Sequence, residues 1–397
     1  MSILTRRIFC KQLLALLGTT ALSSGWQAAA AADENRVRLG YLPITDATPL
    51  LVAHAKGFFT DEGLAADEPV KLRNWSVLAE SFLVGKLNLT HMLLPMPIWM
   101  RYHRQVPIKV LAWAHTNGSA VTVRGDAGIN GFADLAGRQI AVPYWYSMHN
   151  VILQQGLHKV GLQAVIQPQS APLGRDQVNL FILPPPEMPA ALAARKIDGF
   201  IVAEPYNALS EIKIGARIMR FTGDMWQNHP CCVIVMNQHL IDRKPVFTQK
   251  VINALVRAQL WVTEHPLETA KLLGLEGRGY IPLETEVLQR VFSGYSLSAY
   301  GPGNSPRAIR HTDWPVRRIG FQPFPYPSAT RFIVERMRQT VMEGDSSFLA
   351  LLDPDEVAKD LVDDRFVKKA IAAAGGVDRF GLIDPAHPWQ REEVIDI

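Results

Sequence analysis

The chain has 397 residues, 48% of them hydrophobic and 20% charged, a composition typical of a globular protein. Its 41 Lys and Arg residues exceed its 37 Asp and Glu residues, which gives a formal net charge of +4. Three of the basic residues and none of the acidic ones lie in the first 32 positions, so the remainder carries 38 basic against 37 acidic residues. This balance excludes a strongly basic, nucleic-acid-binding protein.

The first 32 residues have the organisation of an export signal. Arg6, Arg7 and Lys11 form a basic region, residues 13–22 form a short apolar run, and residues 28–32 offer a small-residue cleavage context. The run is too short to span a bilayer. The paired arginines match the twin-arginine pattern, with an ordinary secretory leader as the alternative. We therefore expect a signal peptide over 1–32 and a soluble, monomeric product in the periplasm.

About 365 residues remain, more than one hydrophobic core usually holds, so we expect two lobes. Only two cysteines follow the leader, Cys231 and Cys232, and adjacent cysteines rarely form a relaxed disulfide. We expect buried free thiols there and do not favour a metal or redox role. Four histidines also lack the spacing of a zinc motif: His91, His103, His115 and His229.

The first elements after the leader alternate between strands and helices. We expect a strand over 36–42, a helix over 50–56, a strand over 70–73, a helix ending at 83, and a strand over 88–94 that Pro95 and Pro97 close. Thr48 and Pro49 suit the start of the first helix, and Gly57 suits its end. This alternation predicts a doubly wound α/β sheet.

The middle of the chain repeats the alternation after a polar, glycine-rich segment at 125–128. The expected elements are a strand pair over 110–123, a strand over 139–142, a helix over 150–160 capped by Ser147, strands over 179–183 and 200–202, a helix over 187–195, and a strand over 232–236. Amphipathic helices follow from Val251. We therefore assign 33–124 to lobe I, 125–231 to lobe II, and 232–397 to the return into lobe I and the C-terminal helices.

Two such lobes joined by two crossings enclose a cleft, and ligands of α/β sheets bind beyond the carboxyl ends of the strands. The candidate ligand-binding residues at those positions are Thr45, Asp46, Trp75, Asn117, Gly118, Ser119, His149 and Glu204. Helix starts at Pro49 and after Ser147 can supply donors to an oxyanion. Five of the candidates also have a purely structural explanation: helix capping for Thr45 and Asp46, core packing for Trp75, a structural histidine at 149, and a hinge-region glutamate at 204.

The same stretches resemble the nitrate/bicarbonate-binding proteins of ABC importers. The resemblance rests on these stretches, in order along the chain: residues 40–50 and 55–59, Trp75, residues 91–97, 117–118, His149, and residues 184–188, 198–207 and 358–375. It implies the class II periplasmic-binding-protein fold, with doubly wound sheets and two inter-lobe crossings. It also implies that Trp75 and His149 contact the ligand, with Thr45 and Asp46 nearby.

By the same resemblance, the chain is the substrate-binding component of an ABC importer and catalyses nothing. Its partners would be a small oxyanion, a membrane permease and an ATPase. Nitrate is the leading ligand, with bicarbonate and nitrite as alternatives. The residues assign no metal, although calcium remains open if the ligand is bicarbonate, and Asp46 with Glu204 can supply carboxylates for it. Departures from the nitrate binders include Ser119 in place of a glutamine and Tyr206 in place of a tryptophan.

Other functions stay open at this point. The aromatic run 144–146 suits an organic ligand, such as an alkyl sulfonate or a pyrimidine. A pyrimidine-forming enzyme shares the architecture, but the sequence contains no nucleophile–base motif or P-loop. A ligand sensor is a further alternative, which an export signal disfavours if the sensor is cytoplasmic.

Overall fold

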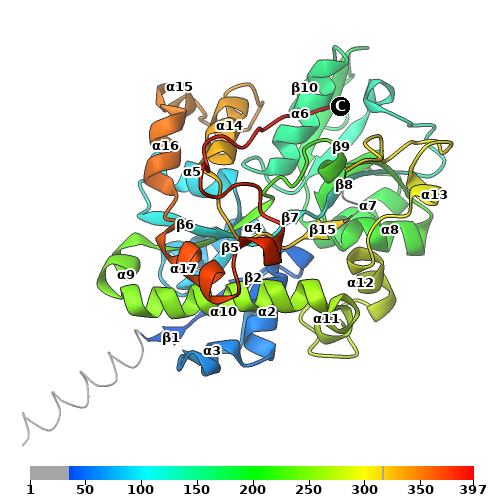
Figure 1. Ribbon diagram of the computed structural model, residues 1–397. Coiled ribbons are helices and arrows are strands. Elements are labelled where there is room, and N and C mark those ends of the chain that lie inside the picture. The colour runs from blue at the N-terminus through cyan, green and yellow to red at the C-terminus, as the bar shows by residue number, and fades with distance from the viewer. Residues whose placement is uncertain (1–34, 315–316) are drawn as a thin grey trace, which may run out of the picture.

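The computed structural model describes residues 35–314 and 317–397, so the predicted signal peptide and its twin-arginine pattern lie outside the described residues. Two α/β lobes lie side by side, with a short two-stranded ribbon between them (Figure 1). Buried apolar side chains of both lobes form one contiguous hydrophobic core. The predicted two-lobed fold is confirmed.

The sheet of the first lobe has the strand order β4-β2-β5-β14-β6. Strand β2 pairs in parallel with β4 and β5, whereas β14 is antiparallel to β5 and β6. The strands are β2 (Leu39–Tyr41), β4 (Val70–Lys71), β5 (Leu89–Leu93), β6 (Ile108–Trp113) and β14 (Cys232–Asn237). The neighbouring segments β1 (Arg36–Val37) and β3 (Ala65–Ala66) pair in parallel as a separate two-stranded ribbon.

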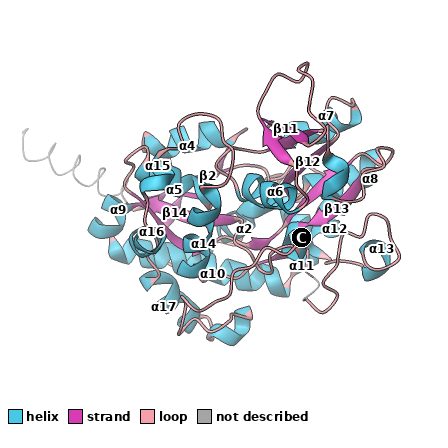
Figure 2. Ribbon diagram, turned by 90° about the horizontal axis from the view of Figure 1, so that it is seen from above, coloured by secondary structure: helices cyan, strands magenta, loops and turns pink. Residues whose placement is uncertain are grey.

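The sheet of the second lobe has the order β10-β11-β9-β12-β8-β13. The first four strands are parallel, and β8 is antiparallel to both of its neighbours. The strands are β10 (Gln163–Val165), β11 (Gln177–Ile182), β9 (Gln139–Val142), β12 (Gly199–Ala203), β8 (Ser119–Val123) and β13 (Arg217–Phe221). Seen from above, these strands occupy the side of the molecule opposite to α9 and α16 (Figure 2).

Two crossings join the sheets. The first runs from β6 to β8 and contains β7 (Thr116–Asn117), which pairs with β15 (Ile319–Gly320). The second runs from β13 to β14 and contains the turn η4 (Thr222–Asp224). Because β8 belongs to the second sheet, the chain leaves the first lobe before residue 119, not at the predicted boundary after 124. The expected strand pair over 110–123 is divided between the sheets, since Asn117 and Gly118 turn the chain with positive φ angles of 57° and 77°.

Local sequence signals explain several helix starts. The Asn74 side chain accepts a hydrogen bond from the Val77 N–H at the start of α4 (Trp75–Leu83), and Ser147 accepts one from Asn150 at the start of α6 (Met148–Lys159). The turn η1 (Thr45–Ala47) leads directly into α2 (Thr48–Ala55). Pro95 begins a helix instead of only closing a strand, because proline suits the first turn of a helix. The remaining helices of this half are α3 (Phe58–Asp61), α5 (Pro95–Tyr102), α7 (Met188–Ala193) and α8 (Tyr206–Ile214).

The C-terminal part is helical and packs mainly on the first lobe. Helix α10 crosses the lower part of the molecule in Figure 1, above α2 and α3, and packs against α2, α3 and α17. In order, the helices are α9 (Gln238–Arg243), α10 (Pro245–Glu264), α11 (Pro266–Leu273), α12 (Thr285–Phe292), α13 (Leu297–Tyr300), α14 (Pro327–Met337), α15 (Phe348–Leu351), α16 (Pro354–Leu361) and α17 (Arg365–Ala373). Among the described residues, none of these or the earlier helices combines the length and hydropathy of a membrane span.

Candidate functional site at the inter-lobe crossings

Four buried side chains with metal-ligand chemistry meet where the two crossings leave the first sheet. Asp46 lies in η1, His115 on the first crossing, and Cys231 and Cys232 at the end of the second. The Asp46 Oδ2 atom lies 3.1 Å from His115 Nε2, 3.0 Å from Cys232 Sγ and 3.7 Å from Cys231 Sγ. All four residues have no exposed surface. We refer to them as the hinge cluster.

Backbone pairing between the crossings places the cluster. The Ala114 N–H donates to the Cys232 carbonyl at 2.9 Å, and the Asn117 N–H donates to the His229 carbonyl at 3.0 Å. A β-bridge between Thr116 and Pro230 lies between these two bonds. The two crossings therefore run antiparallel to each other, which brings residue 115 beside residues 231 and 232.

The second lobe reaches the cluster through two of the predicted site residues. Ser119, the first residue of β8, has its Oγ atom 2.9 Å from His149 Nε2 and 3.7 Å from Cys231 Sγ. His149, the second residue of α6, has Nε2 at 3.8 Å from the same sulfur. Ser119 and His149 thus lie together with Asp46, although Ser119 is at the amino end of the antiparallel strand β8 and not beyond the carboxyl end of a strand.

Burial and neighbouring charges shift the titration of the cluster. Burial by itself lowers the pKa of His115, but the adjacent Asp46 carboxylate outweighs it and raises this pKa to about 10. Burial raises the pKa of Asp46. Burial also acts to raise the pKa of the Cys231 thiol, yet hydrogen bonding by Cys232 and the proximity of His149 hold it well below its usual range. In contrast to Cys231, burial raises the pKa of the Cys232 thiol well above its usual range.

Several buried polar atoms around the cluster have no hydrogen-bond partner. They include Oδ1 of Asp46, Nδ1 of both His115 and His149, and Nε1 of Trp75. An unpaired buried donor or acceptor costs about 1–3 kcal/mol, so a fold rarely retains several of them together without a use. Such atoms are suited to bind a ligand or an ion.

Two further predicted residues support the site from its edge. Trp75, at the start of α4, packs edge-to-face against His91 with ring centroids 5.4 Å apart. Gly118 adopts a φ of 77°, and a Cβ atom there would lie 3.0 Å from His115 Nδ1. A glycine at 118 therefore provides room for the His115 ring. Asn117 instead packs against Gly223 and lines a separate cavity of about 340 Å³ together with Arg317.

Glu204 joins the two lobes by its backbone, while its carboxylate belongs to a different group. The Glu204 carbonyl accepts hydrogen bonds from Thr45 N and Oγ1, at 2.9 and 3.0 Å. Its carboxylate accepts bonds from Arg318 Nε at 2.6 Å and from the Ala208 N–H at 3.0 Å. Arg318 also contacts Glu211 at 2.5 Å. The alternative of an Asp46–Glu204 carboxylate pair for calcium therefore lacks support, because Arg318 occupies the second carboxylate.

The aromatic run over 144–146 is used in packing. Tyr146 stacks on Trp99 with centroids 5.3 Å apart, and the Trp145 Nε1–H donates to Glu343 at 3.1 Å. Tyr144 lines a cavity of about 190 Å³ together with Trp99 and residues of α4 and α5. Packing thus accounts for Trp145 and Tyr146 without an organic ligand, whereas Tyr144 also lines a cavity.

Sequence reasoning missed His115, Cys231, Cys232 and Arg318 as members of these groups. The signal for the cluster was present: each of the three residues adjoins a buried strand, at a crossing. This signal is weak in the sequence alone, because the three residues lie on two segments over 100 positions apart, a spacing that no metal motif has. Arg318 carried no signal, because it follows a long irregular segment.

Comparisons with known proteins agree with the fold. The nitrate/nitrite binding protein NrtA of Nostoc sp. is 28% identical over 302 residues, which cover 70% of this chain and 65% of that protein. The nitrate import ATP-binding protein NrtC of Synechocystis sp. is 26% identical over 338 residues, covering 78% of this chain and 49% of that protein. The chain thus spans less than two thirds of the length of these relatives.

The solved structure of the periplasmic nitrate-binding protein NrtA from Synechocystis superposes with a TM-score of 0.72 at 20% identity, covering 91% of this chain and 94% of that one. This likeness shows a shared fold. Residues 30–273, more than half of the chain, match the model of one protein family. The chain belongs to the NMT1-like family.

Proposed function

We propose that this protein is the substrate-binding component of an ABC importer and that its ligand is a small oxyanion, nitrate first, with nitrite and bicarbonate as alternatives. The observation that carries the proposal is the superposition of nearly the whole chain on a nitrate-binding protein. The relative named as an import ATP-binding protein supports an ATPase, and with it a permease, as the partners. The predicted leader supports export to the periplasm by the twin-arginine route.

The donors for the anion would come from both lobes. Trp75 in the first lobe and His149 in the second are buried, and each has a ring nitrogen without a hydrogen-bond partner. Ser119 holds the other nitrogen of His149, at 2.9 Å, which fixes the orientation of that ring. A small oxyanion requires such fixed donors, because hydrogen bonds must compensate its lost hydration. Closure of the lobes would bring the donors to the ligand.

The test is a binding panel on the purified protein after bound ligand has been removed by partial unfolding and refolding. Thermal unfolding is followed with nitrate, nitrite, cyanate, bicarbonate with and without calcium, a small alkyl sulfonate and a pyrimidine. A ligand present at 100 times its dissociation constant adds about 2.7 kcal/mol of stability. We expect nitrate to raise the unfolding temperature.

Variants locate the binding. Trp75→Phe and His149→Gln each remove one unpaired donor and should weaken nitrate binding. His54→Gln is the matched control, since His54 lies on α2 and bonds to Tyr280 outside the site. A response to the sulfonate or pyrimidine alone would favour the organic-ligand alternative, and conversion of any of these compounds would show an enzyme. The absence of a response to every anion would refute the proposal.

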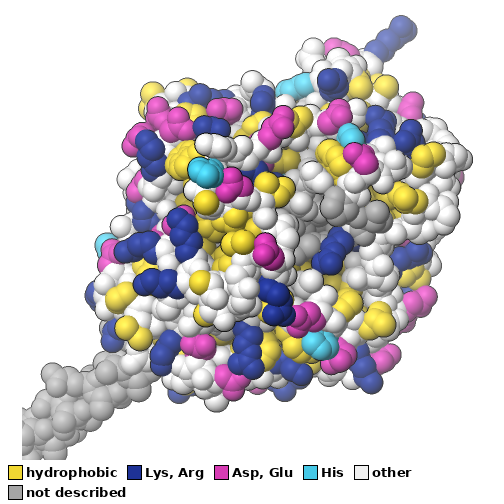
Figure 3. Space-filling model, in the orientation of Figure 1, with side chains coloured by type: hydrophobic (Ala, Val, Ile, Leu, Met, Phe, Trp, Pro, Cys, Tyr) yellow, Lys and Arg dark blue, Asp and Glu magenta, His cyan; other side chains and the backbone are white. Residues whose placement is uncertain are grey.

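The described part of the surface visible in Figure 3 has no large patch of a single charge that would attract anions. Lys and Arg side chains alternate with Asp and Glu over the face shown in Figure 3. Any selectivity for an anion would therefore come from the buried donors, as the balanced charge of the chain after the leader also predicts.

A further inference from the structure

The hinge cluster brings together four different side chains that all ligate metals. Asp46 offers a carboxylate oxygen, His115 an imidazole nitrogen, and Cys231 and Cys232 one sulfur each, and these atoms lie within 4.8 Å of one another. The four residues lie in the turn after β2 and in the two crossings. No other protein group competes for Asp46 Oδ1, which is buried without a hydrogen-bond partner.

The separations match the coordination shell of one small ion. Ligands placed about 2.0–2.3 Å from a tetrahedral centre lie about 3.3–3.8 Å from each other. Around Asp46 Oδ2 the distances are 3.0 Å to Cys232, 3.1 Å to His115 and 3.7 Å to Cys231. All ligand pairs lie within 4.8 Å of one another, so binding requires the widest pairs to draw together by at most about 1 Å.

The donor set selects the kind of metal. Two sulfurs with one nitrogen and one oxygen suit zinc, whereas calcium and magnesium prefer oxygen ligands alone. We propose that Asp46, His115, Cys231 and Cys232 form a tetrahedral zinc-type site at the hinge, in addition to the oxyanion site. As ligands, two thiolates and one carboxylate are anionic, and a dication compensates most of that charge in a place without water.

The position of the site indicates what the ion does. Four protein ligands complete a tetrahedral shell, which is the arrangement of a structural zinc site. His115 belongs to the first crossing and the two cysteines to the second, so the ion would fasten the crossings to each other and to η1. Ser119 and His149 approach Cys231 from the second lobe at 3.7 and 3.8 Å, and they act as outer-shell partners of its sulfur.

The binding experiment uses the full chain with Cys10→Ser, so that Cys231 and Cys232 are its only thiols. The protein is reduced, freed of metal with a chelator, and loaded with Zn²⁺ or with Co²⁺ as a spectroscopic substitute. We expect one ion per chain after dialysis, a thiolate-to-cobalt charge-transfer band, and a higher unfolding temperature with Zn²⁺. Cys231→Ser, Cys232→Ser and His115→Gln should abolish the band or weaken binding by more than the about 10- to 100-fold that outer-shell changes cost.

Controls separate loss of the site from loss of the fold. His54→Gln, on α2, should bind Zn²⁺ like the parent chain. Circular dichroism should show that the serine variants remain folded, because serine replaces each thiol with a similar volume. Failure of the reduced parent chain to retain Zn²⁺, or equal retention by both serine variants, would overturn the proposal. Nitrate titrations of the metal-free and zinc-loaded protein are scored separately, so failure of one proposal is distinguishable from failure of the other.

Discussion

Two buried groups of charged side chains lie near the inter-lobe boundary, and they differ in how fully their polar atoms are paired. In the Arg318 group, two guanidinium nitrogens contact the carboxylates of Glu204 and Glu211, the Tyr300 hydroxyl donates to Glu211, and Arg318 Nη1 is the guanidinium atom without a partner. In the hinge cluster, Asp46 and His115 contact each other, but Asp46 Oδ1 and His115 Nδ1 have no partner. A group that is largely paired internally fixes structure, whereas one with unpaired atoms is suited to bind something else.

The largest effect is expected from breaking the paired group. Arg318→Met leaves Glu204 buried without its countercharge, and removal of one partner of a buried ion pair costs about 3–5 kcal/mol. Burial already raises the pKa of Glu204, against the lowering by Arg318, so the carboxyl should take up a proton in the variant. Denaturant unfolding at neutral pH measures the loss.

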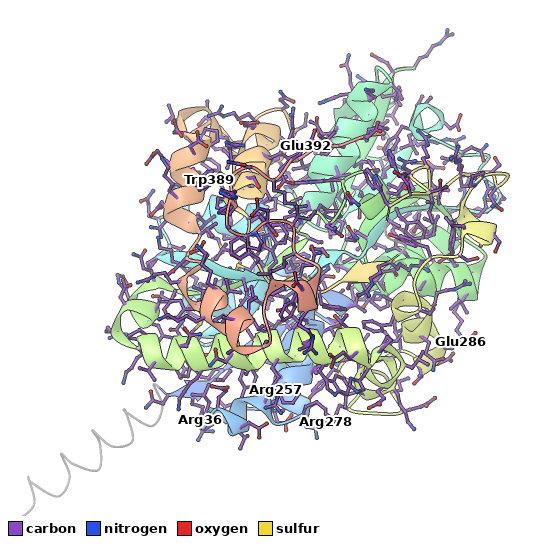
Figure 4. All side chains as sticks on the ribbon, in the orientation of Figure 1. Arg36, Arg257, Arg278, Glu286, Trp389 and Glu392 are labelled. Carbon is purple, nitrogen blue, oxygen red and sulfur yellow. The ribbon has the colours of Figure 1, made fainter. Side chains whose placement is uncertain are left out.

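The matched control for this substitution is Arg257→Met. Arg257 on α10 lies at the molecular surface, where Figure 4 labels it, and pairs with Asp61 at 2.7 Å with about half of its side chain exposed. Exposed pairs contribute about 0–1 kcal/mol. If Arg318→Met cost no more than Arg257→Met, the Arg318 group would not fix the boundary between the lobes.

A structural feature can be predicted from the sequence when the residues that produce it lie close together in the chain. Ser147 is predictable as a helix cap because a cap acts within three residues of itself. The positions of Thr45 and His149 follow from the sequence because each comes after a strand, and the loops beyond the carboxyl ends of strands in α/β sheets meet at one edge. The partner of Glu204 could not be found, since Arg318 is 114 positions away and the pairing depends on the β7–β15 ribbon.

The hinge cluster shows the same limit in another form. Cys231 and Cys232 were correctly expected to be free and buried. Their neighbours were not foreseen, because His115 reaches them only through the antiparallel pairing of the two crossings. Likewise, the sequence did not show that the strand pair expected over 110–123 is divided between the two sheets. The division occurs at Asn117, where a turn with positive φ directs the second strand into the other sheet.

A third group of charged side chains is half-exposed, in contrast to the buried Arg318 group and the buried hinge cluster. Its contribution to stability should depend on pH. Asp360 on α16 accepts hydrogen bonds from Arg101 and Tyr102 of α5, each at 2.7 Å, and lies 3.3 Å from Lys109 Nζ. Burial acts to raise the pKa of Asp360, but the bond from Arg101 and these neighbours hold it well below its usual range. The carboxylate side chain is 43% exposed, so solvent screens the group.

Asp360→Asn should therefore cost about 1–2 kcal/mol near neutral pH, less than a fully buried charged network. Because the folded pKa is depressed, the contribution is complete above the unfolded value of about 3.9 and is lost as the pH falls below it. Urea unfolding of both proteins from pH 7 to pH 3 measures the difference in their free energies of unfolding. This difference should stay constant down to about pH 4 and shrink below it. Asp355→Asn, on the same helix, controls for the loss of one negative charge. A difference that grew in acid would contradict this assignment.

The smallest effect is expected from the hinge cluster itself in the absence of metal. The contacts of Cys231 with Asp46 and Ser119, at 3.7 Å, and with His149, at 3.8 Å, are long, and a thiol is a weak donor. Cys231→Ala should cost about 1 kcal/mol in the chelator-treated protein, mainly through the small cavity that it leaves. In protein loaded with Zn²⁺ the same change should cost more, because a ligand of the bound ion is lost. Parallel denaturant titrations with chelator and with Zn²⁺ measure both values, and Cys231→Ser repeats them without the cavity. An equal cost in both conditions would mean that the unpaired atoms of the cluster do not serve a metal, and the contrast with the Arg318 group would then be one of hydrogen bonding alone.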